Sequence, residues 1–362
     1  MHIAVILPRW VGDLVMSTPM IRAVRQHYGD RARLTAVVKP LYAEILDGTN
    51  WFDGIIPYDR RSRDVGNRFA AAAAALRADP VDIALLVPNS LSSAALAWWG
   101  GCRRRVGYAR HGRRLLLTDP LFPPRRGWQV EPLSTTQHAM DLAERIGVPP
   151  QPLQLELATT AADEALLESV ITRLFPGWAT GPDAPLFVFN DNSAYGPAKA
   201  WGGNRLAGLA RKVLEAFPDG RVVVHCGPGD REEARAVVAA AGDPRVGSLA
   251  DEAALPFGLS KALLRRAAVV VTTDSGPRHI AAAFATPTVV LHGPMDPRLG
   301  MSDHRHLVEL RRDLPCSPCG RRTCPLHHHD CMTGLTVDDV ASATLGLLAE
   351  TTSAHRPAPE NV

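Results

Sequence analysis

The sequence predicts an α/β protein with two Rossmann-like halves, and three observations support this prediction. A repeated order of apolar strand, polar loop and helix runs along the chain and is clearest over residues 268–297. The strands there, Val269 to Val271 and Val289 to Leu291, are nearly continuous in valine, which is typical of parallel strands covered on both faces. The chain has 362 residues, 46% of them hydrophobic, so it is long enough for two domains with separate cores.

The first half opens with a buried strand, His2 to Leu7, followed by a helical pattern that begins at Gly12 and Asp13 and continues to Tyr28. Further strands are expected at three places, separated by helices such as Arg68 to Leu76: Leu34 to Val38, Gly54 to Pro57 and Ile83 to Val87.

The second half begins after a segment rich in Pro and Gly, Phe175 to Pro185, which we interpret as an interdomain linker. Strands are expected at Leu186 to Phe189 and at Arg221 to His225. The predicted domains are 1–178 and 179–335, with a cleft between them as the ligand site. Thr336 is expected to cap a final helix over 336–350, and residues 351–362 have the composition of a disordered tail.

The overall charge argues against nucleic acid as a partner, because 40 Lys and Arg residues face 37 Asp and Glu residues, a net charge of +3. The N-terminal apolar run is too short for a secretory signal or a membrane span, and no later apolar stretch is long enough to cross a bilayer. We therefore expect a soluble, cytoplasmic protein. Arginine is concentrated in one part of the first half, at Arg103, Arg104, Arg105, Arg110, Arg113, Arg114, Arg125 and Arg126. This run is either a solvated face or a surface that steers a phosphorylated, membrane-borne acceptor to the site.

Two loops at helix starts carry candidate chemistry. Asp274, Ser275 and Gly276 follow a strand and open a helix, whose free N–H groups suit a diphosphate, whereas the alternative is simple capping by Asp274 and Ser275. Asp13 also lies at a helix start. It would be charged there and able to accept a proton if well positioned, although such a residue is more often a cap.

Two further loops suggest nucleotide binding. Lys199 lies in a loop that enters a helix, where it is either a phosphate contact or an exposed helix lysine. A tight turn at residues 227–229 precedes another helix, with three acids near its start: Asp230, Glu232 and Glu233.

A cysteine cluster lies near the C-terminus, with histidines inside it: Cys316, Cys319, Cys324 and Cys331. Four thiolates in a turn-rich loop are candidate ligands for a structural zinc or iron ion, although the last two intervals are not those of a standard zinc finger. A structural role without a metal is the alternative.

Several motifs resemble the ADP-heptose:lipopolysaccharide heptosyltransferases, glycosyltransferase family 9, and most closely the heptosyltransferase II type. The longest is DSGPRHIAAAFATPTVVLHGP over residues 274–294. Three other stretches are similar to further motifs of that family: GPAKAW over 196–201, the strand, loop and helix around Asp13, and PNS over 88–90. The sequence departs from the family pattern at Asp191 and Asn192, where Pro-Gly is common, and at Gly202, where Pro is common.

This resemblance implies the GT-B fold, with the last helix crossing back to the first domain, and an inverting transfer of heptose from an ADP-sugar donor. It implies a phosphorylated glycolipid of the lipopolysaccharide inner core as acceptor, met peripherally at the inner membrane's cytoplasmic face. No cofactor is required for transfer. The family roles are carried over as two catalytic residues, Asp13 as general base and Lys199 as a stabiliser of the departing ADP. The donor-binding residues are Ser193, Tyr195, Lys199, Glu232, Asp274, Ser275, Gly276 and His279. Glu232 is assigned to the nucleoside ribose, as the family's acid at this position is, with Asp230 and Glu233 equally compatible by spacing. The acceptor-binding residues are Asn89, Ser90, Arg105 and Arg110.

Two alternatives stay open at this point. One is a GT-B transferase that uses another nucleotide sugar or a protein acceptor, because donor specificity depends on a few hydroxyl contacts. The other is a non-catalytic, metal-stabilised binding protein in which the cysteine loop is the functional part. His279 has its own alternative, that of a buried structural histidine.

Overall fold

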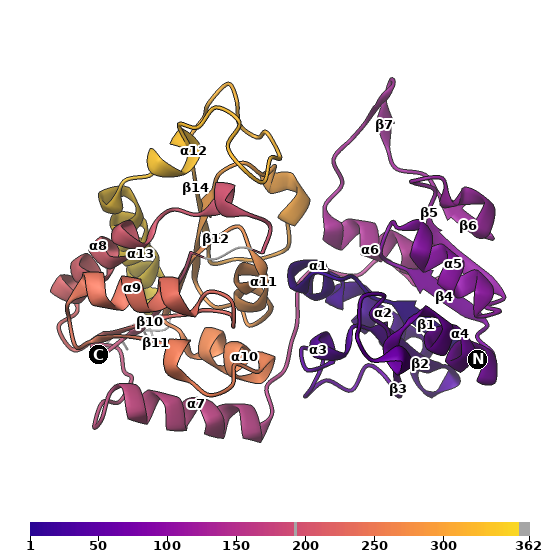
Figure 1. Cartoon of the computed structure of the whole chain (residues 1–362), viewed down its shortest axis with the longest axis horizontal. Coiled ribbons are helices and arrows are strands. Elements are labelled where there is room, and N and C mark those ends of the chain that lie inside the picture. The colour runs from indigo at the N-terminus through magenta and orange to yellow at the C-terminus, as the bar shows by residue number, and fades with distance from the viewer. Residues whose placement is uncertain (192–193, 355–362) are drawn as a thin grey trace, which may run out of the picture. The chain divides into compact units, whose positions relative to one another are not determined.

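The computed structural model describes residues 1–191 and 194–354 and divides the chain into two compact units (Figure 1). The first unit comprises Met1–Ala158 with Arg298–Asp303, and the second comprises Thr159–Pro297 with the chain from His304 onward. Each unit is described by itself below.

The first unit is built on a six-stranded parallel sheet in the order β3-β2-β1-β4-β5-β6. Its strands are β1 (His2–Ile6), β2 (Arg33–Val38), β3 (Gly54–Pro57), β4 (Ile83–Leu86), β5 (Arg104–Tyr108) and β6 (Asp119–Leu121). Its helices are α1 (Val11–Met16), α2 (Thr18–Tyr28), α3 (Pro40–Ala43), α4 (Phe69–Ala78), α5 (Leu91–Trp99) and α6 (Thr135–Glu144). A separate antiparallel pair, β7 (Arg125–Arg126) and β8 (Gln129–Val130), forms a small hairpin.

The second unit repeats this topology with a parallel sheet in the order β11-β10-β9-β12-β13-β14. Its strands are β9 (Leu186–Asn190), β10 (Arg221–Val224), β11 (Val246–Ser248), β12 (Val269–Thr273), β13 (Thr288–His292) and β14 (Leu307–Arg311). Its helices are α7 (Ala161–Leu174), α8 (Gly203–Ala216), α9 (Arg231–Ala241), α10 (Phe257–Arg266), α11 (Gly276–Ala283), α12 (Asp330–Thr333) and α13 (Val337–Ala354).

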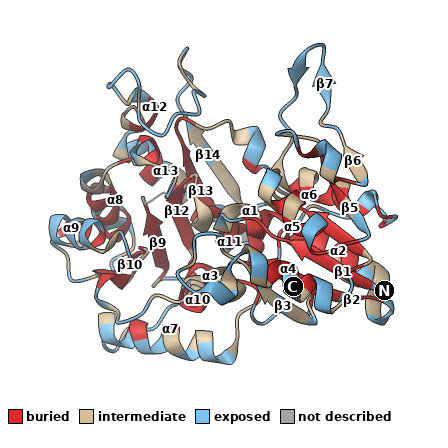
Figure 2. Cartoon of the chain, turned by 45° about the vertical axis from the view of Figure 1, so that its right-hand side comes forward, coloured by how far each residue is buried: buried red, intermediate tan, exposed pale blue. Residues whose placement is uncertain are grey.

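The core of each unit lies on its central strands, which are buried along their whole length and covered by helices (Figure 2). Both faces of such strands need apolar side chains, which explains the continuous valine and isoleucine in the sequence. Parallel pairing places the carboxyl ends of neighbouring strands at one edge of each sheet. In both sheets the strand order reverses beside the first strand of the unit, between β1 and β4 and between β9 and β12. Ligands of such sheets bind at this switch point.

The predicted fold class is confirmed, because each unit is a parallel six-stranded sheet with the strand order of a Rossmann-like domain. The strands lie where the sequence predicts them to within about two residues. The expected helix from Gly12 to Tyr28 is in fact two helices. The break falls at Ser17, whose hydroxyl donates to the Asp13 carbonyl at 2.7 Å. The second helix starts at Thr18 and has Pro19 in its first turn.

The division between the units falls at residues 158 and 159, not at the predicted 178 and 179. Helix α7 belongs to the second unit because it packs on α10 through charged pairs. Arg265 lies 2.9 Å from Glu164, and Arg266 lies 2.6 Å from Glu168. The segment predicted as a linker therefore leads from α7 into β9 within one unit.

The final helix begins as predicted, with a reciprocal cap in which Thr336 Oγ1 accepts from the Asp339 N–H and the Asp339 carboxylate accepts from the Thr336 N–H, both at 3.1 Å. It packs against α8 and strands β12 to β14 of the second unit. The helix continues to Ala354, so the start of the predicted tail is helical. The rest of that tail, residues 355–362, lies outside the described residues.

Candidate functional site

Each sheet carries polar residues at its switch point. In the first unit Asp13 lies on the helix after β1 and Asn89 lies just after β4; in the second, Asn190 ends β9 and Asp274 follows β12. The sequence places these residues far apart, and the parallel topology brings each pair to one edge of its sheet.

Lys199, Asp274 and Arg278 form the charged centre of the second unit. The Asp274 carboxylate accepts from Lys199 Nζ at 3.0 Å and from Arg278 Nη1 at 2.7 Å, and the Lys199 ammonium also donates to the Asp274 carbonyl. Lys199 is 8% exposed and Arg278 is 4% exposed. Burial alone would raise the pKa of Asp274, but Arg278 and Lys199 outweigh it and hold this pKa well below its usual range. Asp274 is therefore an anion that fixes two cations.

A second carboxylate completes this cluster from the neighbouring strands. The Glu309 carboxylate on β14 accepts a hydrogen bond from His292 Nε2 at 2.9 Å. The same carboxylate oxygen lies 3.5 Å from Arg278 Nη2. The hydrogen bond from His292, aided by Arg278, lowers the pKa of Glu309 below its ordinary value. Arg278 thus bridges two carboxylates, which orients its guanidinium beside the start of α11.

His279 adds a neutral imidazole next to these charges. It is 5% exposed, and burial, followed by the positive charge of Arg278, lowers its pKa to about 3. Within residues 1–191 and 194–354, neither ring nitrogen makes a hydrogen bond. A neutral imidazole at this position could donate to or accept from a ligand hydroxyl or phosphate oxygen.

Ser275 does not cap α11 through its side chain, contrary to the capping interpretation. Its hydroxyl accepts a hydrogen bond from Asn190 Nδ2 at 3.1 Å. The other amide atom, Asn190 Oδ1, lies 3.3 Å from His225 Nδ1. On the far side of that ring, His225 Nε2 lies 2.9 Å from Ser260 Oγ. Burial lowers the pKa of His225 to about 4. This uncharged chain fixes Ser275 and leaves the first N–H groups of α11, beginning at Gly276, without a side-chain cap.

The loop before Lys199 is held from both ends. Tyr195 donates to the Gly320 carbonyl at 2.6 Å, and its ring lies 5.1 Å from Lys199 Nζ. Asp191, which replaces the proline common in the family, accepts from the Trp201 and Gly202 N–H groups at 2.5 and 2.7 Å. It therefore anchors the start of α8, although burial raises its pKa to about 6. Ser193 lies outside the described residues.

Glu232 is not brought to this cluster. It lies exposed in the first turn of α9, and none of the contacts in the described part of the chain joins it to Lys199 or Asp274. Asp230, the alternative considered from spacing, is half-buried just before that helix, and burial raises its pKa.

In the first unit Asp13 lies in the first turn of α1 and is half-buried. The residue before this helix, Trp10, has a side chain that cannot accept a hydrogen bond from the first turn, so a negative charge from Asp13 complements the helix N-terminus there.

Asn89 is held by a buried cation. The Arg113 guanidinium is 0% exposed and donates to Asn89 Oδ1 at 2.9 Å, to Ser93 Oγ at 3.1 Å and to the Pro88 and Tyr108 carbonyls. All of these acceptors are neutral, and burial lowers the pKa of Arg113 to about 10, so it remains charged at neutral pH. The Asn89 amide is thereby fixed with Nδ2 directed to His138.

His138 completes this group. Its Nε2 lies 3.2 Å from Asn89 Nδ2, and its ring stacks on Tyr108 with centroids 4.0 Å apart. Burial lowers the pKa of His138 to about 4, with Asp141 opposing and Arg113 reinforcing this shift. Because Nε2 accepts from Asn89, the proton of this neutral imidazole lies on Nδ1.

The other predicted acceptor residues differ in position. Ser90 caps α5 by accepting from the Ser93 N–H at 3.2 Å. Arg110 follows the carboxyl end of β5, close enough to His138 to influence its pKa. Arg105 lies near the opposite end of that strand and donates to the Leu116 and Cys102 carbonyls, so it is not brought together with Asn89.

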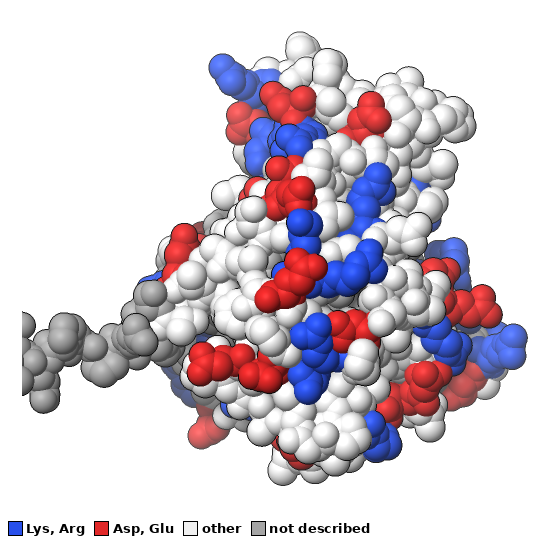
Figure 3. All heavy atoms as spheres, turned by 90° about the vertical axis from the view of Figure 1, so that its left-hand side faces the viewer, with Lys and Arg blue, Asp and Glu red and all other residues white. Residues whose placement is uncertain are grey.

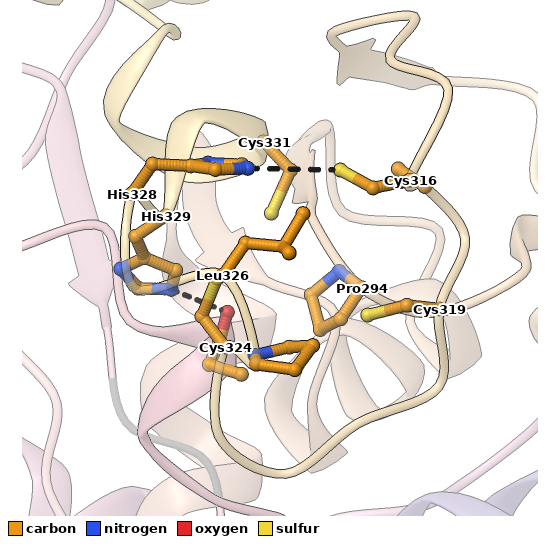
Figure 4. Close-up of a pocket in the computed structure, with 11 residues that line it drawn as sticks. Pro294, Cys316, Cys319, Cys324, Leu326, His328, His329 and Cys331 are labelled. Atoms are coloured by element: carbon orange, nitrogen blue, oxygen red, sulfur yellow. Dashed lines mark hydrogen bonds between the residues drawn. The ribbon is translucent and has the colours of Figure 1, made fainter.

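The four predicted metal ligands line one pocket together with His328 and His329 (Figure 4). Leu326 and Pro294 also line this pocket, and the contact from Cys316 Sγ to His328 Nε2 is 4.0 Å. In the part of the chain that the structure describes, no three His, Cys, Asp or Glu side chains are grouped so that they could hold a metal ion. Backbone N–H groups, first that of His329, lower the pKa of Cys324.

The surface and helices add two observations on partners. On the face drawn in Figure 3, acidic and basic side chains are interspersed, unlike the one-sided basic surface that is typical of nucleic-acid binding. Among residues 1–191 and 194–354, no helix is both long and apolar enough to span a bilayer.

Sequence reasoning missed several members of these groups. Arg278 lies inside the longest motif and four residues after Asp274, so the helical spacing of opposite charges was an available signal. No local pattern marks Asn190 or Glu309, and the arginine run does not distinguish Arg113 from its neighbours, because the partners of all three are far away in the sequence.

The family model of glycosyltransferase family 9 (heptosyltransferase) matches residues 69–329. Lipopolysaccharide heptosyltransferase 2 of Salmonella typhimurium is 28% identical over 305 residues, which cover 82% of this chain and 84% of that protein.

Two solved structures share the fold. E. coli ADP-heptose lps heptosyltransferase II has a TM-score of 0.78 at 24% identity and covers 97% of this chain and 100% of its own. The glycosyl transferase family 9 protein of Veillonella parvula has a TM-score of 0.81 at 20% identity and covers 96% of this chain and 97% of its own.

Proposed function

Because this chain belongs to glycosyltransferase family 9 (heptosyltransferase), we propose that it transfers a heptose from ADP-heptose to an inner-core acceptor of lipopolysaccharide. The observation that carries this proposal is the cluster of Lys199, Asp274 and Arg278 at the switch point of the second sheet. Enzymes of this class need cations or helix N-termini where the departing diphosphate develops charge, and this cluster supplies both.

We assign donor binding to the second unit. Lys199 is close to the uncapped start of α11, because its ammonium donates to the Asp274 carbonyl two residues before that helix. A diphosphate there would receive the Lys199 ammonium and the N–H of Gly276, while Asp274 balances the two cations when the site is empty. His279, a neutral imidazole beside Arg278, Asp274 and Lys199, is assigned to the donor sugar or diphosphate.

We assign acceptor activation to the first unit, with Asp13 as general base. The acceptor oxygen attacks the anomeric carbon from the face opposite the diphosphate, so a new C–O bond forms as the bond to the diphosphate oxygen breaks. The proton of the acceptor hydroxyl passes to the Asp13 carboxylate, and ADP leaves with the bonding electron pair. The configuration at the anomeric carbon is inverted.

Acceptor binding is assigned to the residues around Asn89. Ser90 and Arg110 lie on the same edge of the sheet as Asn89, and Arg110 is a suitable contact for an acceptor phosphate. The interactions of Arg105 with main-chain carbonyls favour a structural role for this residue. We propose a phosphorylated glycolipid at the cytoplasmic face of the inner membrane as the acceptor.

No step of this reaction is assigned to a metal, because Lys199 and the α11 N-terminus supply positive charge at the leaving group. A structural zinc or iron ion at Cys316, Cys319, Cys324 and Cys331 stays a prediction. Its support is the soft donor set around one pocket, although within residues 1–191 and 194–354 these side chains are not grouped as ligands. Metal analysis of protein purified without chelator tests it, and a metal content well below one equivalent would contradict it.

The proposed function is tested by nucleotide preference and turnover. Thermal unfolding is measured with ADP, UDP and GDP, and ADP at about a hundredfold its Kd should add about 2.7 kcal/mol of stability. Incubation with ADP-heptose and a core acceptor should then release ADP and extend the acceptor by one heptose. A preference for UDP or GDP would contradict the donor assignment, and transfer to a protein rather than to the core acceptor would contradict the acceptor assignment.

A further inference from the structure

The β7–β8 hairpin of the first unit is exposed along its whole length. Its two strands pair only with each other, with Arg125 opposite Val130 and Arg126 opposite Gln129, and every residue from 124 to 132 is exposed (Figure 2). Gly127 adopts the left-handed conformation, with φ of +62°, that closes the turn. An isolated two-stranded hairpin is only marginally stable in water, so a surface that it contacts would order it.

The hairpin presents large apolar side chains to solvent. Trp128, at its tip, is 95% exposed, Phe122 at its base is 62% exposed, and Leu115 in the preceding helical turn is 93% exposed. The Arg114 guanidinium lies 5.8 Å from the centre of the Phe122 ring, so this turn and the hairpin base are neighbours. Single exposed apolar residues are common, but a tryptophan at the tip of a projecting hairpin is typical of an interfacial anchor.

The same segment is positively charged. Arg114, Arg125 and Arg126 are exposed, and none of them forms an ion pair within residues 1–191 and 194–354. The one acidic residue between positions 109 and 130, Asp119, is bound to Arg104 at 2.9 Å. The charge is local, because the whole chain carries a net charge of only +3.

We propose that this hairpin docks the protein on an anionic phospholipid surface, with Trp128 in the interfacial layer and the arginines on lipid phosphates. Tryptophan prefers the boundary between headgroups and acyl chains, and arginine is attracted to anionic lipids. Apolar side chains beside unpaired arginines on one small projection match this chemistry. The inference rests on the proposed function in one respect: docking would bring the enzyme to an acceptor held in a bilayer.

Vesicle binding tests this inference without any sugar. We expect the full-length protein to sediment with vesicles of phosphatidylethanolamine and phosphatidylglycerol, less so at high salt, and not with vesicles of phosphatidylcholine alone. Trp128→Ser and the double variant Arg125→Ser/Arg126→Ser should each weaken binding, by about tenfold or more for the arginine pair. Arg60→Ser/Arg61→Ser is the matched control, since these two arginines are also adjacent and exposed in the first unit, and it should bind like the parent.

The variants should melt at the parent temperature, because the hairpin contributes no packing. They should also turn over a water-soluble acceptor fragment at the parent rate. Equal vesicle binding by the hairpin variants and the parent, or no binding by the parent at low salt, would overturn the inference. Loss of turnover on the soluble fragment would also overturn it and assign the hairpin to acceptor recognition. Failure of the parent to transfer heptose at all would contradict the proposed function and leave the vesicle result to be judged separately.

Discussion

Lys199 is the residue on which the donor assignment depends most. Its ammonium is nearly buried, and Asp274 neutralises it while Arg278 holds the other carboxylate oxygen. A cation fixed in this way needs little rearrangement to meet a phosphate, because its partner already holds it beside the start of α11. The side chain is thus preorganised for an anion.

We predict that Lys199→Met weakens ADP binding by about 10- to 100-fold, since a hydrogen bond to a charged group contributes about 1.5–3 kcal/mol. Isothermal titration with ADP checks this. The control is Lys212→Met, which removes an exposed lysine paired with Asp338 on the surface and should leave ADP affinity unchanged. Unchanged affinity in both variants would remove Lys199 from the donor site.

At this scale the sequence predicted residues with a local motif and missed those defined by distant partners. Lys199, Asp274 and His279 lie in loops or helix starts with recognisable surroundings, and the structure brings them together. Arg113 has no such surroundings, and its role follows only from acceptors supplied by β5, α5 and the loop after β4.

At the scale of elements, the contact between α7 and α10 shows how a helix is assigned to a unit. Gly258 on α10 lies against the Asp163 carboxylate. This carboxylate accepts from the Thr160 N–H at 2.9 Å in the cap of α7. It also lies 3.7 Å from Lys261, which is fully buried. Close approach at Gly258 lets this one carboxylate serve both helices.

We predict that Gly258→Ala destabilises the protein by roughly 2–4 kcal/mol, because the added methyl overlaps the Asp163 carboxylate and separates it from the cap and from Lys261. The control is Gly346→Ala on α13. A methyl there meets nothing within 4 Å and should stabilise the protein by about 0.5–1 kcal/mol. Urea unfolding of both variants measures the difference, and a neutral Gly258→Ala would contradict the close packing described.

The unit boundary could not be placed from composition alone. The Pro and Gly residues of Phe175–Pro185 mark a turn inside the second unit, whereas the true connection, which precedes α7, contains Pro149, Pro150 and Pro152 and buries Leu155 and Leu157. Both segments are rich in proline. Only the packing of α7 on α10 decides between them.

At the scale of the whole molecule, buried histidines make folding sensitive to acid. Burial lowers the pKa of His138 and His225 to about 4 and that of His279 to about 3, from an ordinary 6.5. The unfolded chain therefore binds these protons first as the pH falls, so stability is full above about pH 6.5 and decreases below it. Asp191 acts in the opposite sense, because its raised pKa of about 6 makes the folded state bind its proton first.

We predict a net loss of stability between pH 6.5 and 4.5, with each neutral histidine contributing up to about 1.4 kcal/mol per pH unit. Urea unfolding at several pH values should give a shallower slope for His225→Gln and a steeper slope for Asp191→Asn. A parent protein whose stability rises on acidification in this range would contradict the buried, neutral state of these histidines.

We propose, above all, that the Asp13 carboxylate of the first unit activates the acceptor hydroxyl, whereas ADP is bound by the second unit alone. The most direct measurement compares Asp13→Asn with Asp30→Asn, an exposed surface carboxylate, for turnover of ADP-heptose and for ADP affinity. The account predicts that Asp13→Asn lowers kcat by about 10²- to 10⁴-fold with an unchanged Kd for ADP, and that Asp30→Asn changes neither. A variant lacking the Asp13 carboxylate that still transfers heptose at the parent rate would contradict it.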